Sequence, residues 1–262
     1  MTATIQLANT EYRFDPNEPL DISIPLRFDG PQPNAYGVEP AASQACQYGE
    51  LVGDTRRGGS CNFEQITLIP HCNGTHTECV GHITNQRISV RDCLIDAFMP
   101  AILVSIAPEA NGDDDLLITR SRLEQALAGK NSCVPSSLIV RTLPNNESKL
   151  TRLYNSENIP PYFASQAMEL IVELGFTHLL VDLPSIDRLF DDGKLANHRI
   201  FWNIEPGSFD VTAATRMNST ITELICVPES VVDGDYLLNL QIAPFEADAA
   251  PSRPMLFASQ KN

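Results

Sequence analysis

Apolar residues in the middle of the chain follow two different periods. Short apolar runs bounded by Pro, Gly or polar residues predict buried strands at 100–106, 137–142 and 177–182. Apolar residues at helical spacing predict helices over 117–128 and 163–174, and a glycine follows each, as is common where helices end. Strands then dominate toward the C-terminal end. This order predicts an α/β fold with a mixed central β-sheet flanked by helices.

The rest of the chain carries a weaker pattern. One strand is predicted within the first 60 residues, at Asp21–Leu26, and another at Gln65–Pro70. The proline-rich loop between them, Asp29–Ala42, could cover a site or mediate contact between subunits. A loop rich in alanine and proline, Ala243–Pro254, is expected before a final short strand. With no repeat and no compositional break, a single domain is expected over residues 1–262.

Charge and hydropathy narrow the classes of partner. The chain has 33 acidic and 18 basic residues, and its net charge of −15 argues against binding to nucleic acid or to an anionic membrane surface. No apolar run is long enough to span a membrane, and the first residues do not resemble a secretory signal. Seven cysteines, an odd number, fit a reducing compartment, so a cytoplasmic location is expected. The expected partner is a small-molecule substrate.

Potential metal ligands are crowded into residues 71–82. Three of the five histidines of the chain lie there, together with one glutamate and two cysteines. In an extended strand alternate side chains share a face, so Cys72, His76 and Glu78 would face the same way. His71 would then point away as a neighbour that hydrogen-bonds the site, unless a bulge rotates it into the ligand set. Imidazole, carboxylate and thiolate are ligands of divalent metals, so this segment is a candidate metal site.

The same segment resembles the signature of the metal-dependent cyclase family, which includes bacterial kynurenine formamidase and isatin hydrolase. That signature reads His-x-Gly-Thr-His-x-Asp-x-Pro-x-His. The positions that match in register are Gly74, Thr75, His76 and His82. Cys72 stands in place of the first histidine and Glu78 in place of the aspartate, and the proline is missing. Further landmarks of the family are similar to Asp21–Leu26, Val181–Asp187, His198 and Thr222–Leu224. Tyr236–Pro244 is similar to the closing strand of the family, so the resemblance predicts a strand there. The resemblance covers most of the chain and implies the swivelling β/β/α fold of the family.

The resemblance also implies roles for individual side chains. The metal ligands would be Cys72, His76, Glu78, His198 and Glu223, and two ions often share the acid in this family. His82 would transfer protons as general acid and base. A divalent ion activates water and polarises a carbonyl, so these parts together would hydrolyse a small amide, formamide or lactam, as kynurenine formamidase does. A homodimer or a higher homo-oligomer is expected.

The departures from the signature leave several outcomes open. A thiolate at Cys72 is a soft ligand that favours Zn²⁺, with Mn²⁺ as the alternative. Glu78 is one methylene longer than aspartate, which can move its carboxylate by about a bond length against a site tolerance of roughly 0.5 Å. The chain could therefore be a slower or different hydrolase, a protein with one ion instead of two, or a non-catalytic zinc- or ligand-binding paralogue.

Other notable side chains have a structural interpretation beside the functional one. Trp202, the only tryptophan, could line an aromatic substrate pocket or pack in the core. His178 is expected to be structural, and so is Cys79, because a buried free cysteine behaves as a small apolar residue. A disulfide between Cys72 and Cys79 is disfavoured by the reducing compartment. The polar residues expected to fix a loop are Asp182, Ser185 and Asp187.

Overall fold

A mixed β-sheet runs through the centre of the molecule. The computed structural model describes residues 1–112, 115–130 and 136–261. Within them the sheet has eleven strands in the spatial order β1-β2-β20-β18-β10-β13-β16-β17-β9-β19, and β3 also pairs with β20. The strands are β1 (Ala3–Leu7), β2 (Thr10–Phe14), β3 (Leu20–Asp21), β9 (His76–Glu78), β10 (Phe98–Ile106), β13 (Ser137–Thr142), β16 (His178–Val181), β17 (Thr220–Glu223), β18 (Gly234–Asn239), β19 (Ala249–Pro251) and β20 (Met255–Lys261).

The middle of this sheet is parallel. β10, β13, β16 and β17 run in the same direction, and antiparallel β18 and β9 extend them on either side. Successive residues of β10 enter different cores: Ile102 and Val104 pack with the helices, whereas Ala101 and Leu103 pack on the opposite face. Because both faces are buried, these strands need nearly continuous apolar runs. The predicted strands at 100–106, 137–142 and 177–182 are accordingly confirmed.

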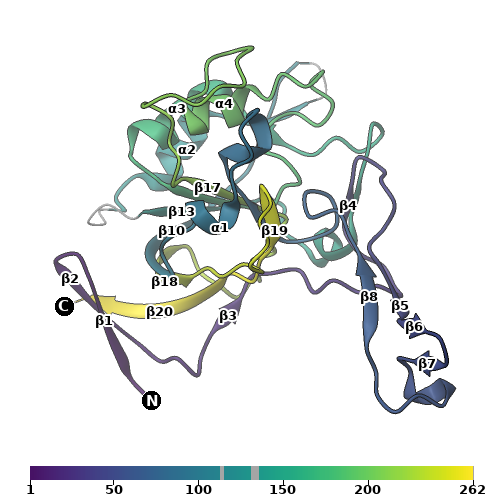
Figure 1. Cartoon of the computed structure of the whole chain (residues 1–262). Helices are drawn as coiled ribbons and strands as arrows, with labels where there is room; N and C mark the ends of the chain where they lie inside the picture. Colours follow the sequence, from purple (N-terminus) through teal and green to yellow (C-terminus); the bar gives the residue numbers. More distant parts are fainter. Residues whose placement is uncertain (113–114, 131–135, 262) are drawn as a thin grey trace.

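Three helices cover one face of the sheet (Figure 1), namely α2 (Arg120–Leu127), α3 (Ser165–Glu173) and α4 (Ala196–Trp202). The fold is thus a single α/β domain with a mixed central sheet, as predicted. Both predicted helices begin later than expected, because Leu117 and Phe163 lie in short strands. The hydroxyl of Thr119 caps α2 by accepting from the N–H of Arg122 at 3.3 Å. Among the described residues, no helix is long and apolar enough to cross a membrane.

The N-terminal region departs most from the prediction. Residues 1–60 contain seven short strands where one was expected. The predicted strand Asp21–Leu26 is reduced to β3 and an isolated bridge between Ser23 and Ile225. The predicted closing strand Tyr236–Pro244 ends at Asn239. The remaining elements are β4 (Asn34–Ala35), β5 (Ala42–Ala45), β6 (Gln47–Tyr48), β7 (Leu51–Val52), η1 (Thr55–Arg57), β8 (Glu64–Thr67), η2 (Val80–Ile83), α1 (Val90–Cys93), β11 (Glu109–Ala110), β12 (Leu116–Ile118), η3 (Glu147–Thr151), β14 (Leu153–Tyr154) and β15 (Tyr162–Phe163).

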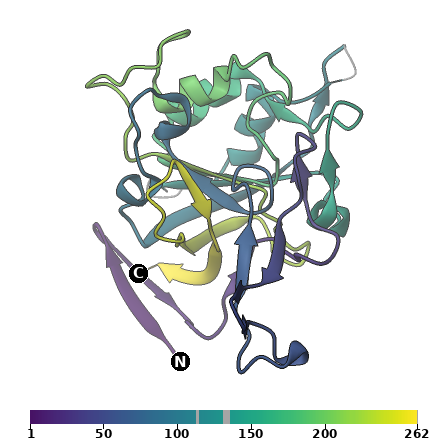
Figure 2. The same cartoon turned by 45° about the vertical axis from the view of Figure 1, so that its right-hand side comes forward.

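An arm formed by residues 42–67 projects from the body of the molecule in both views (Figures 1 and 2). It consists of the antiparallel pair β5–β8, with β6, β7 and η1 beyond it toward the tip. The predicted strand Gln65–Pro70 therefore belongs to this arm, not to the central sheet, and it ends at Thr67. The chain then turns directly into the segment that carries the candidate ligands.

Candidate metal centre

Strand β9 places two of the predicted ligands on one face. It pairs antiparallel with β17, so that Glu223 lies opposite His76 and Thr222 lies opposite Thr77. Residues directly opposite in such a pair share a face, and residues two apart on a strand do as well. His76, Glu78 and Glu223 therefore point into the same space, where His76 Nε2 lies 3.6 Å from Glu223 Oε2. The hydroxyl groups of Thr77 and Thr222 meet at 2.8 Å.

Helix α4 delivers the fourth residue to the same space. His198 Nε2 lies 3.1 Å from Glu78 Oε1 and 3.9 Å from Glu223 Oε1. The other ring nitrogen, Nδ1, lies 2.6 Å from Asp187 Oδ2. Asp187 was expected to fix a loop, and it accepts the backbone N–H groups at the start of α4 while it also orients the imidazole. His198 and Glu223, which are distant in the sequence, thus meet beside β9.

Three partly exposed side chains form the open edge of the cluster, which we call the rim: His71, His82 and Asp248. His71 Nε2 lies 3.0 Å from Asp248 Oδ2 and 3.4 Å from Glu78 Oε2. The rings of His71 and His82 stack with centroids 4.4 Å apart, and His82 Nδ1 lies 3.5 Å from Asp248 Oδ2. Side-chain exposure is 25% for His71 and 28% for His82, against 1% for Glu78. Solvent therefore reaches the cluster from the rim.

The structure places His71, rather than Cys72, with the candidate ligands. Residues 70–75 turn instead of extending, and the N–H of Cys72 donates to the carbonyl of Ile69 at 3.0 Å. The expected alternation of side chains therefore begins only at His76. Cys72 joins none of the ligand groups found among the described residues. Burial and the nearby charge of Glu223 raise the pKa of its thiol to about 11.

Two backbone features of glycine shape this segment. Gly74 has φ +141°, a conformation that other residues rarely adopt, and its carbonyl oxygen lies 2.9 Å from His76 Nδ1. Because a carbonyl can only accept, Nδ1 must carry the hydrogen, which leaves the lone pair of a neutral His76 on Nε2. Gly81 precedes His82, and a Cβ atom there would lie 2.2 Å from the carbonyl oxygen of Ile88. Only glycine allows this close approach.

The two buried carboxylates differ in their preference for a proton. Burial raises the pKa of Glu78, but the imidazoles of His82, His198 and His71 outweigh it, and the pKa is lowered. Burial and the charge of Glu78 both raise the pKa of Glu223. Two carboxylates in one dry space repel each other unless a cation or proton lies between them. A cation bound between Glu78 and Glu223 would therefore relieve this repulsion.

The imidazoles respond to the same charges. Burial opposes protonation of His198, but hydrogen bonds to Asp187 and Glu78 raise its pKa well above the usual value. The pKa of His71 is also raised, because Asp248 and Glu78 outweigh its burial. Hydrogen bonds from His71 and His82 in turn lower the pKa of Asp248. The cluster thus combines acceptors and imidazoles that compensate one another's charge.

The geometry fits a divalent metal ion. Two groups of potential ligands share Glu78, and a third group forms the rim; they are His76 with Glu78 and Glu223, Glu78 with His82 and His198, and His71 with His82 and Asp248. His76 Nε2 is buried and has no hydrogen-bond partner in the structure. Donor atoms about 2.1 Å from a shared tetrahedral ion lie roughly 3.4 Å apart, close to the 3.6 Å between His76 Nε2 and Glu223 Oε2. All these donors are nitrogen or oxygen.

The other residues singled out in the sequence lie in the core. Trp202 is completely buried, its ring lies 5.5 Å from that of His198, and its Nε1 donates to the carbonyl of Ser219. It therefore supports His198 from behind instead of presenting a free surface to solvent. His178 is buried beside Thr220. Cys72 and Cys79 are both free thiols.

Two residues near the centre were not identified from the sequence. Asp248 lies in the loop before β19 and carries no local motif; its backbone carbonyl accepts from the N–H of Cys79 at 3.0 Å. Tyr36 lies in the proline-rich loop, which a hydrogen bond from Ala35 to the carbonyl of Cys72 ties to the turn. Its ring packs edge-on against Phe190 at 5.5 Å. The sequence pointed to Tyr36 only indirectly, through the expectation that this loop could cover a site.

Curated relatives match nearly the whole chain. The chain is 25% identical over 248 residues to a kynurenine formamidase of Bacillus thuringiensis (strain Al Hakam), covering 92% of this chain and 97% of the relative. It is also 25% identical over 245 residues to a kynurenine formamidase of Bacillus anthracis, with 90% and 96% covered.

Solved structures show the same fold. A novel cyclase matches with a TM-score of 0.64 at 14% identity, covering 94% of this chain and 90% of that one. Isatin hydrolase A from Labrenzia aggregata matches with a TM-score of 0.62 at 14% identity, with 93% and 94% covered. The Cyclase family model, described as "Putative cyclase", matches residues 20–188, which is more than half of the chain. The chain therefore belongs to the Cyclase family.

Proposed function

We propose that this chain is a metal-dependent hydrolase of a small amide, formamide or lactam. The observation that carries the proposal is the pair of ligand groups that share buried Glu78, one with His76 and Glu223 and one with His82 and His198. The relatives named kynurenine formamidase and the structural neighbour named isatin hydrolase support the same substrate class.

The residues of the chain would divide the work between the buried cluster and the rim. His76, Glu78, Glu223 and His198 would hold the metal, and Asp187 would keep His198 in place. When bound, a divalent ion would activate water and polarise the carbonyl oxygen of the substrate. The nitrogen and oxygen donors suit Zn²⁺ and Mn²⁺ alike.

His82 is our candidate for general acid and base. Its Nδ1 faces Asp248 at 3.5 Å, which favours a hydrogen on Nδ1 and leaves Nε2 free to accept a proton. The imidazole could take a proton from the attacking water and return it to the leaving nitrogen. Because His82 also belongs to a ligand group with Glu78 and His198, its role must be separated from metal binding by experiment.

The deciding experiment measures metal content and hydrolysis on the same preparations. Protein purified without added metal or chelator should contain stoichiometric divalent metal by elemental analysis, and the double variant His76→Ala with Glu78→Ala should contain none. Glu78→Gln should also lose hydrolysis of formanilide and of an aryl lactam. Glu246→Gln is the matched control, because that glutamate is 81% exposed and, among the residues that the structure describes, forms an ion pair with Arg91 alone.

Two results would change the conclusion. Unchanged metal content in the double variant would remove the metal centre. Metal-loaded wild type that turns over nothing on a broad amide and lactam panel would instead support a zinc- or ligand-binding paralogue without catalysis. A cytoplasmic location, and the lack of nucleic-acid and membrane partners, remain predictions.

A further inference from the structure

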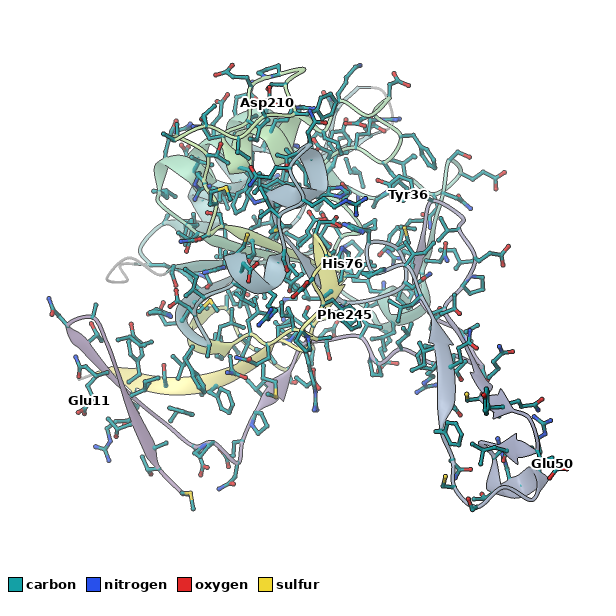
Figure 3. All side chains as sticks on the ribbon, in the orientation of Figure 1. Glu11, Tyr36, Glu50, His76, Asp210 and Phe245 are labelled. Carbon is teal, nitrogen blue, oxygen red and sulfur yellow. The ribbon has the colours of Figure 1, made fainter. Side chains whose placement is uncertain are left out.

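We propose that a cavity between helices α3 and α4 is a binding site for a small amphipathic amine, a molecule with an apolar body and one ammonium group. The cavity has a volume of about 840 Å³, and none of the candidate metal ligands borders it. In Figure 3, Asp210, which follows the cavity residue Phe209 in the chain, lies at the top of the molecule, apart from His76 in its centre. This inference does not rest on the proposed activity.

Apolar side chains line much of the cavity. They come from α3, from α4 and from the loops on either side of α4, and they are Val172, Ala196, Ile200, Ile204, Pro206 and Phe209. Val172 and Ile200 also pack against the core on the helical face of the sheet, which holds this part of the lining in place. Phe209 is 51% exposed. Small-molecule sites are concave, mostly apolar cavities of about 300–1,000 Å³, so both the size and the lining suit a small ligand.

A nearly buried arginine fixes the two loops that flank the cavity. Arg199 is 7% exposed, and its Nε donates to the carbonyl of Lys194 at 3.0 Å. Its Nη1 donates to the carbonyls of Glu205 at 3.2 Å and Ser208 at 2.5 Å. The guanidinium carbon lies 5.3 Å from the centroid of the Phe209 ring. Three of the five N–H groups of this side chain are thus donated to the walls, so the cavity is preformed and Arg199 serves mainly as its support.

Charge favours a cation as the polar end of the ligand. Three glutamates border the cavity, namely Glu169, Glu173 and Glu205. Glu173 pairs with Arg120 at 2.9 Å, whereas Glu169 and Glu205 form no ion pair with any residue that the structure describes. Both are exposed, so either carboxylate can turn toward an ammonium group. The net charge of −15 adds a field that attracts cations to the protein.

Helix α4 connects the cavity to the candidate metal centre. His198 and Arg199 are consecutive residues of this helix, and the first reaches Glu78 while the second borders the cavity. A ligand in the cavity would therefore contact the helix that positions His198.

The test is isothermal titration calorimetry of the full-length protein with phenethylamine. Wild type should bind one molecule per chain with a Kd below about 1 mM. 3-Phenylpropionate has the same ring and spacer but carries a carboxylate, and it should bind at least about tenfold more weakly. Equal binding of the two molecules would overturn the proposal.

Two variants locate the bound amine. Glu169→Gln with Glu205→Gln should weaken binding about 2- to 30-fold, because two exposed charges are lost. Phe209→Ser should weaken it at least about fivefold, because an aromatic wall is lost. The matched controls lie outside the cavity and should bind as wild type: Glu157→Gln with Glu229→Gln, which removes two other exposed glutamates, and Phe245→Ser, whose phenylalanine is 46% exposed.

Circular dichroism and thermal unfolding would verify that every variant keeps the fold. Wild type that shows no saturable binding overturns the proposal. Binding that is unchanged in both cavity variants does so as well, and so does an equal loss in the controls. Since the titration needs neither substrate nor turnover, failure here is independent of any failure of the proposed activity.

Discussion

Replacing Asp187 by asparagine should weaken metal binding without unfolding the protein. The carboxylate of Asp187 accepts from three donors: Oδ1 accepts from Asn197 N–H at 2.7 Å, and Oδ2 accepts from His198 N–H at 3.2 Å and lies 2.6 Å from His198 Nδ1. Asparagine has the same shape but only one accepting oxygen. In the variant, either the N–H of Asn197 or the ring of His198 must therefore face an NH₂ group instead of an oxygen.

Either orientation of the amide disturbs the centre. If its NH₂ faces His198 Nδ1, that nitrogen must accept, and the ring hydrogen moves to Nε2, the atom that faces Glu78 at 3.1 Å. The lone pair needed for a metal is then lost. If its NH₂ faces the N–H of Asn197 instead, two donors oppose each other at the start of α4. Partners of this kind typically contribute 10–100-fold to metal affinity, which corresponds to about 1.4–2.7 kcal/mol.

The assay is competition for Zn²⁺ with a chromophoric chelator, followed by thermal unfolding with and without the ion. Asp191→Asn is the matched control, because Asp191 accepts from the N–H groups of Gly193 and Leu195 in the same loop and does not contact His198. A folded Asp187→Asn protein with wild-type zinc affinity would refute the reasoning. An equal loss of zinc affinity in Asp191→Asn would show that the effect comes from a general disturbance of the loop and not from the contact between Asp187 and His198.

Three further changes probe the rim, the glycine and the core. His82→Ala should keep the metal and slow hydrolysis of formanilide by about 10²–10⁴-fold; parallel loss of metal, measured by elemental analysis, would make His82 a ligand instead. Gly81→Ala should cost about 1–3 kcal/mol in urea unfolding, since the new Cβ would lie 2.2 Å from Ile88 O; an unchanged midpoint would contradict the close approach. Burial lowers the pKa of His178 to about 4, so the unfolded chain takes up a proton first and stability should fall by up to about 3 kcal/mol as pH drops from about 6.5 to 4. In His178→Asn this part of the acid sensitivity should vanish, and a pH profile parallel to wild type would exclude His178 as its source.

The central strands could be predicted because burial on both faces leaves a direct mark on the sequence. β10, with buried Ile102 and Leu103 facing opposite cores, reads as one apolar run. The arm leaves a weaker mark, because its strands are mostly exposed and polar: only the strand found at Glu64–Thr67 was predicted, and the other three were not. Strands whose contacts are this sparse lack the alternation on which a prediction depends.

The candidate site was predictable only where the backbone is regular. His76 and Glu78 lie on a true strand, so period-two reasoning applies to them, whereas Glu223, which lies opposite His76, was expected from the family resemblance. His71 lies in the turn of residues 70–75, where Gly74 has a φ of +141° that no alternation rule anticipates. Asp248 reaches the rim because β19 pairs with β9, a contact set by tertiary structure alone. Asp248 is one of two acids in an alanine-rich loop and carries no periodic or motif signal.

The exchange of Cys72 for His71 also changes the argument about the metal. The sequence favoured zinc because a thiolate would be a soft ligand, yet the donors gathered in the structure are imidazoles and carboxylates. Two of those carboxylates are buried together, and the pKa of Glu223 is raised by burial and by the charge of Glu78. A cation between them would remove that repulsion, and any divalent ion of suitable size could do so. The buried carboxylates therefore require a positive charge, whichever divalent ion supplies it. Which metal binds is decided by coordination geometry and by the supply of each ion.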